Sequence, residues 1–212
     1  MKIVLKSIND LIPHEEIEYD RMKNILVSML KVGYIFKPII VDKVKNVIID
    51  GHHRFHALKM LGFKQVPVVE ADYGEDIKFI NSWMHVSNDV NASENPKRFF
   101  NELLHSVKHG TSEVYVKFDD DIYRVGVDQI DFYLTMKEFT INKNPLSMLY
   151  KLPSNKDVCF SYNTCIIMPK LHEQDVYKVT SENIVLPPRT TYHVTHLKSI
   201  KRIIPLHVLK AF

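Results

Sequence analysis

The sequence predicts a mixed protein of the α/β or α+β class, organised as two units. Short segments rich in β-branched residues alternate with segments whose apolar residues recur at helical spacing, which is typical of chains that combine sheets and helices. The 212 residues fall between the usual sizes of one domain and two, and a polar stretch at residues 87–96 is the best boundary. We therefore expect an N-terminal domain at residues 1–90 and a C-terminal domain at residues 91–212.

The N-terminal half is predicted to alternate strands and helices. Residues 2–8 are β-branched and alternate in polarity, which indicates an opening strand. Apolar residues at helical spacing predict a helix over residues 17–32, and Gly33 suits its end. Pro67 suggests an edge position for the strand that contains it. Further strands are expected at residues 37–42, 47–50 and 65–69, a helix at 52–61, and a strand or short helix at 76–84.

The C-terminal half carries a similar mixture. The run Asp119-Asp120-Asp121 predicts the turn of a hairpin across residues 113–126. The spacing of Cys159 and Cys165 fits neither a C-x-x-C redox pair nor a four-ligand zinc site, so both are expected to be buried small apolar residues. The remaining expected elements are helices near residues 96–108, 127–138 and 172–179 and strands near 157–168 and 191–197.

Composition and charge limit the functional classes. With 45% apolar and 25% charged residues the chain resembles an average globular protein, which excludes wholesale disorder. A net charge of +3 is too small for a non-specific polyanion binder, although it permits a local anion site. No apolar run reaches 18 residues, and the start lacks the apolar stretch of a signal peptide. We therefore expect a cytoplasmic protein without a membrane partner.

The most informative segment spans residues 47–62. A strand of buried type ends in Asp50, Gly51 makes the turn, and a helix begins at once. The first N–H groups of a helix lack internal partners, and the helix dipole adds partial positive charge there. Three side-chain donors follow in the first helical turn, namely His52, His53 and Arg54. Together these features predict an anion site, most naturally for phosphate.

Asp50 does not suit a bare phosphate site, because its carboxylate would repel the anion. A carboxylate beside phosphates is explained if it holds Mg²⁺, which prefers oxygen ligands and bridges to phosphate oxygens. The alternative interpretation is purely structural: Asp50 caps a surface helix, and the histidines after it are solvated.

The segment from Asp50 to Gly62 resembles the signature of the ParB/sulfiredoxin fold. Sulfiredoxins carry a reactive cysteine just before the His-Arg of this motif, whereas this chain has His52 there, so that reaction lacks its nucleophile. ParB partition proteins share the pattern Gly51-x-x-Arg54-x-x-Ala57 but continue into a helix-turn-helix region. We find no such region after residue 100.

A third branch, the free-serine kinases, matches at several motifs in order. The resemblance covers nearly the whole chain and is weakest at about residues 90–165. It implies a ParB/sulfiredoxin-like N-terminal domain and a smaller α/β C-terminal domain that closes over a cleft. The matching residues are Pro13-His14-Glu15, then Gly33, Lys37 and Pro38, then Asp50 to Arg54, then Asp72-Tyr73 and Trp83, and finally Pro188 to Val194.

The resemblance implies a kinase that phosphorylates free L-serine to O-phospho-L-serine. Glu15 matches the family's catalytic base, which accepts the proton of the serine hydroxyl. Asp50 is also the candidate Mg²⁺ ligand, and the donor is ATP or ADP, which share the phosphates that the motif would bind. The residues implied in nucleotide and phosphate binding are Ser28, Pro38, Ile39, Ile40, Asp50, Gly51, His52, His53 and Arg54.

For the serine acceptor, the resemblance implies Trp83, Arg189, Thr191 and His193. Arginine can bind a carboxylate through two parallel hydrogen bonds. The chain departs from the family in having Arg189 in place of lysine and Tyr192 in place of arginine, which keeps a kinase acting on threonine or a polyol as an alternative. A second alternative is a ParB-like regulator that binds a nucleotide or DNA. The oligomeric state is left open.

Overall fold

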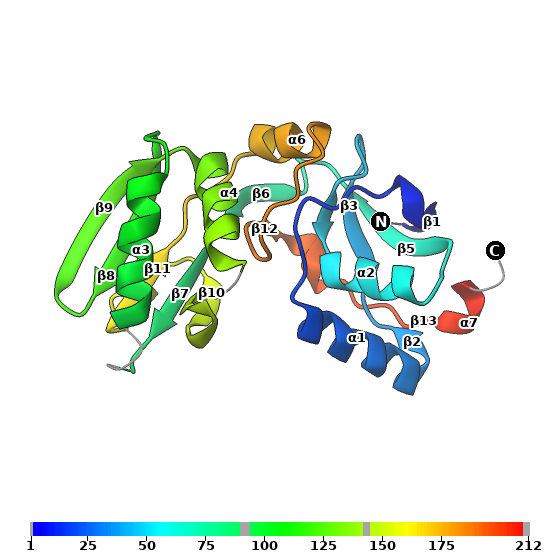
Figure 1. Ribbon diagram of the computed structural model, residues 1–212. Helices are drawn as coiled ribbons and strands as arrows, with labels where there is room; N and C mark the ends of the chain where they lie inside the picture. Colours follow the sequence, from blue (N-terminus) through cyan, green and yellow to red (C-terminus); the bar gives the residue numbers. More distant parts are fainter. Residues whose placement is uncertain (1, 90–93, 142–144, 210–212) are drawn as a thin grey trace. The chain divides into compact units, whose positions relative to one another are not determined.

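The structure is a computed structural model that describes residues 2–89, 94–141 and 145–209 (Figure 1). The chain forms two compact units. Unit 1 comprises Met1–Phe79, Val176–Pro188 and His193–Phe212, and unit 2 comprises Ile80–Asp175 and Arg189–Tyr192. The division therefore falls earlier than the expected one at residue 90, and two C-terminal segments return to unit 1. Part of the polar stretch predicted as the boundary, residues 90–93, lies outside the described residues.

Unit 1 is built on a four-stranded sheet in the order β1-β5-β3-β4. Strand β5 pairs antiparallel with β1 and parallel with β3, and β4 pairs antiparallel with β3. The expected strands and helices are confirmed here: β1 (Ile3–Ser7), α1 (Tyr19–Val32), β3 (Ile39–Asp42), β4 (Ile48–Asp50), α2 (His52–Met60) and β5 (Gln65–Ala71). Gly33 ends α1 in the left-handed conformation, with φ of 75°.

The expected edge position of the strand with Pro67 is wrong, because β5 lies between β1 and β3. The register explains why a proline is tolerated in this interior strand. Pairing with β3 begins at Val68, so Pro67 stands outside the ladder on that side and its missing N–H removes no bond to β3.

The C-terminal segments complete unit 1. Leu206 and Leu209 belong to the same buried apolar cluster as Met22, Phe55 and Leu58 of the two helices, which is why the chain end packs with the first unit. The other elements of this part are η1 (Ile8–Asp10), β2 (Tyr34–Ile35), η4 (His196–Ser199), β13 (Ile204–Pro205), which pairs with β2, and α7 (Leu206–Leu209). Elements that extend across a unit boundary are β6 (Ile77–Asn81), β12 (Tyr192–Thr195), which pairs with β6, and α6 (Glu173–Ser181).

Unit 2 contains a five-stranded antiparallel sheet in the order β10-β7-β11-β8-β9. Helices α3 and α4 lie side by side (Figure 1), and the centres of the Phe100 and Phe132 rings between them are 6.4 Å apart. The predicted hairpin is confirmed, with Asp119 in the left-handed conformation at its turn. The elements are β7 (Trp83–Ser87), α3 (Glu94–Ser106), β8 (Ser112–Phe118), β9 (Asp121–Val127), α4 (Gln129–Thr140), η3 (Pro145–Met148), β10 (Tyr150–Pro153), α5 (Lys156–Cys159) and β11 (Thr164–Ile167).

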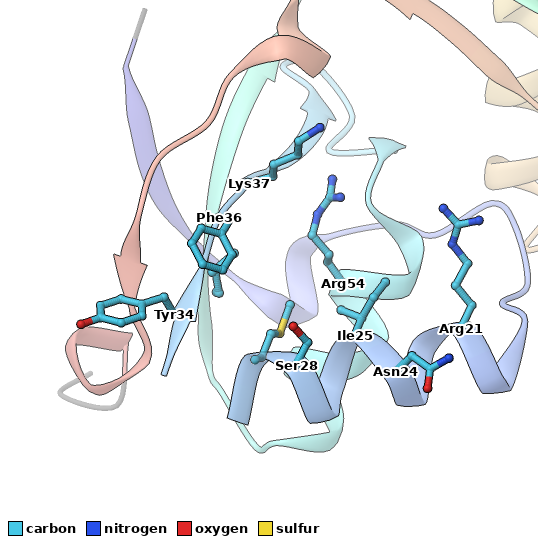
Figure 2. A pocket seen from close by; sticks show the side chains of 10 residues that line it. Arg21, Asn24, Ile25, Ser28, Tyr34, Phe36, Lys37 and Arg54 are labelled. Carbon is cyan, nitrogen blue, oxygen red and sulfur yellow. The ribbon is translucent and has the colours of Figure 1, made fainter. Parts of the chain in front are cut away.

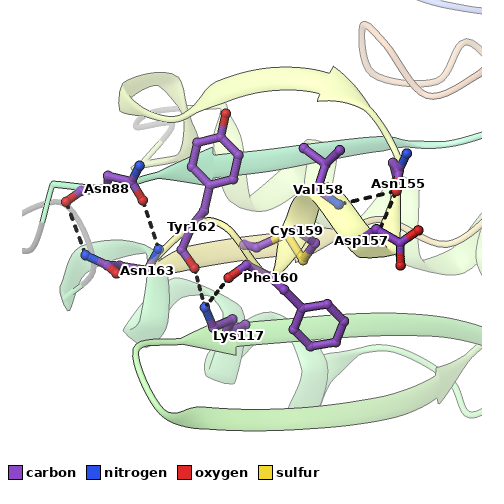
Figure 3. Close-up of a disulfide and its surroundings, with 10 residues drawn as sticks. Asn88, Lys117, Asn155, Asp157, Val158, Cys159, Phe160, Tyr162 and Asn163 are labelled. Atoms are coloured by element: carbon purple, nitrogen blue, oxygen red, sulfur yellow. Dashed lines mark hydrogen bonds between the residues drawn. A yellow bond between two sulfur atoms is a disulfide. The ribbon is translucent and has the colours of Figure 1, made fainter.

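The two cysteines correct the sequence-based expectation. Cys159 and Cys165 are buried as predicted but form a disulfide, and the strand expected at residues 157–168 is interrupted there (Figure 3). Cys159 ends the short helix α5, and only Thr164–Ile167 forms a strand. Lys117 closes the turn between them by donating to the carbonyls of Phe160 (3.3 Å) and Tyr162. Within the described ranges, no helix combines the length and apolar character needed to cross a membrane.

Candidate active site

The predicted strand–turn–helix is present at the start of α2. Gly51 has φ of 111°, a conformation that residues with a Cβ rarely adopt. A Cβ at this position would also lie 2.8 Å from Nη2 of Arg54. Phe55 N–H donates to the Gly51 carbonyl at 2.8 Å, which is the first turn of α2. The N–H groups that precede it in this turn have no intrahelical acceptor and point to where an anion would bind.

Arg54 is held beside Asp50 at this turn. Its Nη2 donates to Asp50 Oδ2 at 2.5 Å and to the Pro38 carbonyl at 3.4 Å. Burial disfavours ionisation of Asp50, but the charges of Arg54, Lys198 and Lys37 and the hydrogen bond from Arg54 lower its pKa. Asp50 is therefore a carboxylate rather than a neutral acid. Nε of Arg54 is buried and has no hydrogen-bond partner within the described part of the chain.

Sequence reasoning missed Lys198, which belongs to the same cluster. Lys37 Nζ donates to its carbonyl at 3.2 Å. Burial lowers the pKa of the Lys198 amine, while the carboxylates of Asp50 and Glu15 act in the opposite direction. The Lys198 amine is thus close enough to interact electrostatically with both Asp50 and Glu15, one from each predicted site segment. In the sequence, the one hint of a role for Lys198 is that it follows His193 by five residues. Its place near α2 depends on the fold.

A pocket of about 400 Å³ opens between α1, β2 and α2 (Figure 2). It brings together Ser28 and Arg54, which the sequence predicted, with Lys37. The sequence did not single out the aromatic wall, formed by Tyr34 and Phe36 with exposed fractions of 41% and 50%. The other lining residues are Arg21, Asn24, Ile25, Met29 and Ile35. The pocket therefore has an apolar end and a cationic end.

Two of the residues implied in nucleotide binding do not line this pocket. Ile39 and Ile40 are buried in β3, which pairs with β5 on one side and β4 on the other. Their side chains belong to the interior. Pro38 enters the site only through its carbonyl, which accepts from Arg54.

Glu15 lies on the loop that connects η1 to α1, and the residue is 7% exposed. The main chain on both sides of it is fixed by Leu186. Leu186 N–H donates to the His14 carbonyl at 2.9 Å, and Glu16 N–H donates to the Leu186 carbonyl at 2.8 Å. His14 Nε2 lies 3.7 Å from Glu15 Oε1. The carboxylate is therefore carried by a segment with defined main-chain contacts.

The first two histidines of α2, His52 and His53, contact this loop and do not act as the predicted side-chain donors to phosphate through Nε2. Nε2 of His52 accepts the N–H of His14 at 3.4 Å, and Nε2 of His53 accepts the N–H of Glu18 at 3.1 Å. A nitrogen that accepts a hydrogen bond carries no proton, so it cannot donate one to an anion. Their backbone N–H groups keep that capacity. These bonds bring the loop of Glu15 against the start of α2.

In unit 2, three of the predicted acceptor residues lie together. Trp83 Nε1 donates to the Thr191 carbonyl at 3.0 Å, and the guanidinium carbon of Arg189 lies 5.2 Å from the centre of the Trp83 ring. The ring of Tyr192 meets the indole edge-on at 5.3 Å. Arg189 has φ of 61°, an uncommon conformation for a residue with a side chain. The fourth predicted residue, His193, belongs to unit 1.

Residues 2–79 match the family described as the ParB N-terminal domain. A ParB-like protein of Sulfolobus acidocaldarius is 28% identical over 190 residues, which cover 90% of this chain and 89% of that protein. An ATP-dependent L-serine kinase of Staphylothermus marinus is 37% identical over 84 residues, 38% of this chain, and the match spans only 33% of that kinase.

The solved structure of a free serine kinase in complex with AMP has the same fold. Its TM-score is 0.74 with 20% sequence identity, and the superposition covers 98% of this chain and 93% of that one. The fold predicted from the sequence is thereby confirmed beyond the matched residues 2–79, and the resemblance to the free-serine kinases is confirmed with it.

A buried histidine cluster lies in unit 1, next to Glu15. The rings of His14 and His52 are 4.7 Å apart and those of His14 and His193 are 6.1 Å apart, while Nε2 of His193 hydrogen-bonds the Tyr73 hydroxyl at 2.9 Å. Burial lowers the pKa of His14 to about 4 and those of His52 and His193 well below the usual value. All three are neutral near pH 7. His193 is 1% exposed, which does not suit its predicted contact with serine.

We expect acid to destabilise the protein through this cluster. Between about pH 6.5 and 4 the unfolded chain binds protons on these histidines and the folded chain does not, so the free energy of unfolding falls as pH falls. His14 alone should contribute a loss of about 3 kcal/mol, at about 1.4 kcal/mol per pKa unit. Urea unfolding at pH 7.5, 6, 5 and 4.5 measures it. A constant unfolding free energy across this window would contradict the assignment.

Proposed function

We propose that this protein transfers a phosphoryl group from ATP or ADP to the hydroxyl of free L-serine, giving O-phospho-L-serine. One observation carries the proposal: the loop of Glu15 is hydrogen-bonded to the first turn of α2, where Arg54, Lys37 and Lys198 concentrate positive charge. A proton acceptor beside a phosphate-binding turn is what phosphoryl transfer to an alcohol requires. The L-serine kinases among its relatives support the same class of reaction. A cytoplasmic location, where adenine nucleotides are abundant, is part of this proposal.

The pocket at α1 and α2 is proposed to bind the nucleotide. Its aromatic wall of Tyr34 and Phe36 and the side chain of Ile25 offer a surface on which adenine can stack. Arg54 stands toward the proposed phosphate end, where Lys37 adds a second cation, and Ser28 lines the pocket from α1 (Figure 2). Arginine and backbone N–H groups suit phosphate oxygens because they donate several hydrogen bonds in a fixed geometry.

Magnesium fits this site as an ion carried by the nucleotide. Within the described ranges, no group of three or more His, Cys, Asp or Glu side chains is arranged to hold a metal ion. Asp50 supplies one carboxylate, which is ionised and engages Arg54 through Oδ2. Mg²⁺ at phosphates commonly uses one or two protein carboxylates and several waters, so Asp50 would serve as a single ligand. The bound ion would neutralise phosphate charge.

In the proposed reaction, residues of this chain position the serine hydroxyl and the phosphates and accept one proton. Glu15 accepts the hydroxyl proton of serine as the serine oxygen attacks the terminal phosphorus of the nucleotide. The bond from that phosphorus to the bridging oxygen breaks, and the nucleotide leaves with one phosphate fewer. Arg54 and Lys37, with Lys198, stabilise the negative charge of the transferring group and of the leaving nucleotide. A general base of this kind contributes about 10²–10⁴-fold to the rate.

The acceptor residues are proposed to be Trp83, Arg189 and Thr191, with the serine carboxylate bound by Arg189. We expect Arg189→Met to raise the KM for serine about 10–100-fold, because a hydrogen bond to a charged group contributes about 1.5–3 kcal/mol. Arg189→Lys restores the residue usual in the family and should lose much less. Initial rates at varied serine concentration measure both. An unchanged KM in Arg189→Met would place the carboxylate elsewhere.

The direct test incubates the purified protein with Mg²⁺, ATP or ADP, and serine, and detects O-phosphoserine by mass spectrometry. Threonine and glycerol in place of serine test the related acceptors. Comparing ATP with ADP identifies the donor. No phosphorylated product from any of these acceptors with either nucleotide would overturn the proposal.

A ParB-like regulator is the second candidate, favoured by the match to the Sulfolobus ParB-like protein over 90% of the chain. Such a protein would bind DNA or respond to a nucleotide without consuming serine. Filter binding of labelled duplex DNA at 50 and 200 mM salt distinguishes the two, because phosphate contacts weaken steeply as salt rises. Salt-dependent DNA binding without O-phosphoserine formation would favour the regulator.

A further inference from the structure

We infer that His53 is a positioning residue that holds the loop of Glu15 against α2, and that it is not a phosphate ligand. The expected kinetic effect rests on the proposed function, whereas the contact itself can be tested by a measurement that needs no enzymatic activity. His53 and the loop are joined by the hydrogen bond from Glu18 N–H to His53 Nε2, 3.1 Å long.

The geometry of this bond determines what the imidazole can do. Glu18 is the N-cap residue of α1, and its N–H donates to the His53 ring on α2. Because Nε2 of His53 accepts, its lone pair is directed at the loop, and the ring proton must sit on Nδ1. A phosphate that needed Nε2–H of His53 would have to break this bond.

The loop between Pro13 and Glu18 has anchors on both sides of Glu15. On the N-terminal side, Leu186 and His52 both bond to the main chain of His14. On the C-terminal side, Glu16 bonds to Leu186 and Glu18 bonds to His53. The His53 side chain thereby links the C-terminal end of the loop to the phosphate-binding turn. Misplacing a reacting group by about 1 Å can lower a rate about 10²-fold.

His53 is a better probe of this link than His52. His52 is 7% exposed and packs on His14 in the buried histidine cluster, so changing it would also alter stability. His53 is only partly buried. Glutamine can present a side-chain oxygen close to the position of Nε2, whereas alanine offers no acceptor.

The first experiment compares His53→Ala with His53→Gln by hydrogen exchange and by kinetics. We expect His53→Ala to speed exchange of the Glu18 amide at least 10-fold and lower kcat about 10–100-fold, with the nucleotide Kd changed less than twofold. His53→Gln should restore most of the exchange protection and most of kcat. The control Lys59→Ala, on the same helix, should match the wild type in each measurement.

The second experiment removes the donor. Glu18 has φ of −79°, which a proline can adopt, so Glu18→Pro deletes the N–H while keeping this backbone angle. Its loss of kcat should resemble that of His53→Ala, and the double variant should be no worse than either single one. Additive losses, or a nucleotide Kd that rises about 10-fold in His53→Ala, would overturn the inference. Unchanged exchange at Glu18 in His53→Ala would overturn it whether or not the wild type is a kinase.

Discussion

Replacing Glu15 with glutamine should lower kcat for O-phosphoserine formation about 10²–10⁴-fold, the usual contribution of a general base. Glutamine has the same shape but cannot accept the hydroxyl proton. The bonds that hold this part of the loop involve the main chain of His14, Glu16 and Leu186, so the substitution leaves them in place. The loss should therefore appear in kcat, while the nucleotide Kd stays within about twofold.

Two controls sharpen this test. Glu16→Gln removes the neighbouring, exposed carboxylate and should keep most of the wild-type kcat. Thermal unfolding of both variants shows whether Glu15→Gln is folded. If Glu15→Gln retains full activity, Glu15 is not the base, and the proposed mechanism fails even though the nucleotide pocket is unaffected.

The parts of this site that local sequence could predict are those that depend on neighbouring residues. The turn at Gly51 follows from a strand, a glycine and a helix start in direct succession, and the structure has that turn. Gly33 likewise ends α1 in the left-handed conformation, as glycine at this position predicts. The strand order of unit 1 had no such local signal, and Pro67 even pointed to the wrong place.

The parts that could not be predicted depend on contacts between distant segments. Lys198 reaches the electrostatic environment of Asp50 only because the chain end returns to unit 1. The residue types of His52 and His53 suggested donors to phosphate, but a histidine ring nitrogen can donate or accept, and its partner decides which. Here the partners are the N–H groups of His14 and Glu18, in the loop of Glu15. The disulfide of Cys159 and Cys165 similarly requires a turn that the spacing alone did not reveal.

Gly51→Ala should have the second large effect, on nucleotide binding and on stability. The backbone at φ of 111° is strained for alanine, which costs about 1–3 kcal/mol of unfolding free energy. The new Cβ would also meet the Arg54 guanidinium at 2.8 Å and displace it from Asp50. Losing the aligned arginine should raise the nucleotide Kd about 10-fold or more, since a charge-assisted hydrogen bond contributes about 1.5–3 kcal/mol. Isothermal titration with ADP and urea unfolding measure the two effects.

Gly62→Ala is the matched control because Gly62 ends the same helix in a left-handed conformation, with φ of 75°, and a Cβ there meets nothing within 4 Å. It should cost about 1–2 kcal/mol of stability and leave the nucleotide Kd unchanged. The difference between the two variants isolates the contact with Arg54 from the strain of the backbone. If both alanine variants bind ADP like the wild type, the first turn of α2 does not hold the phosphates, and the nucleotide must bind elsewhere on the chain.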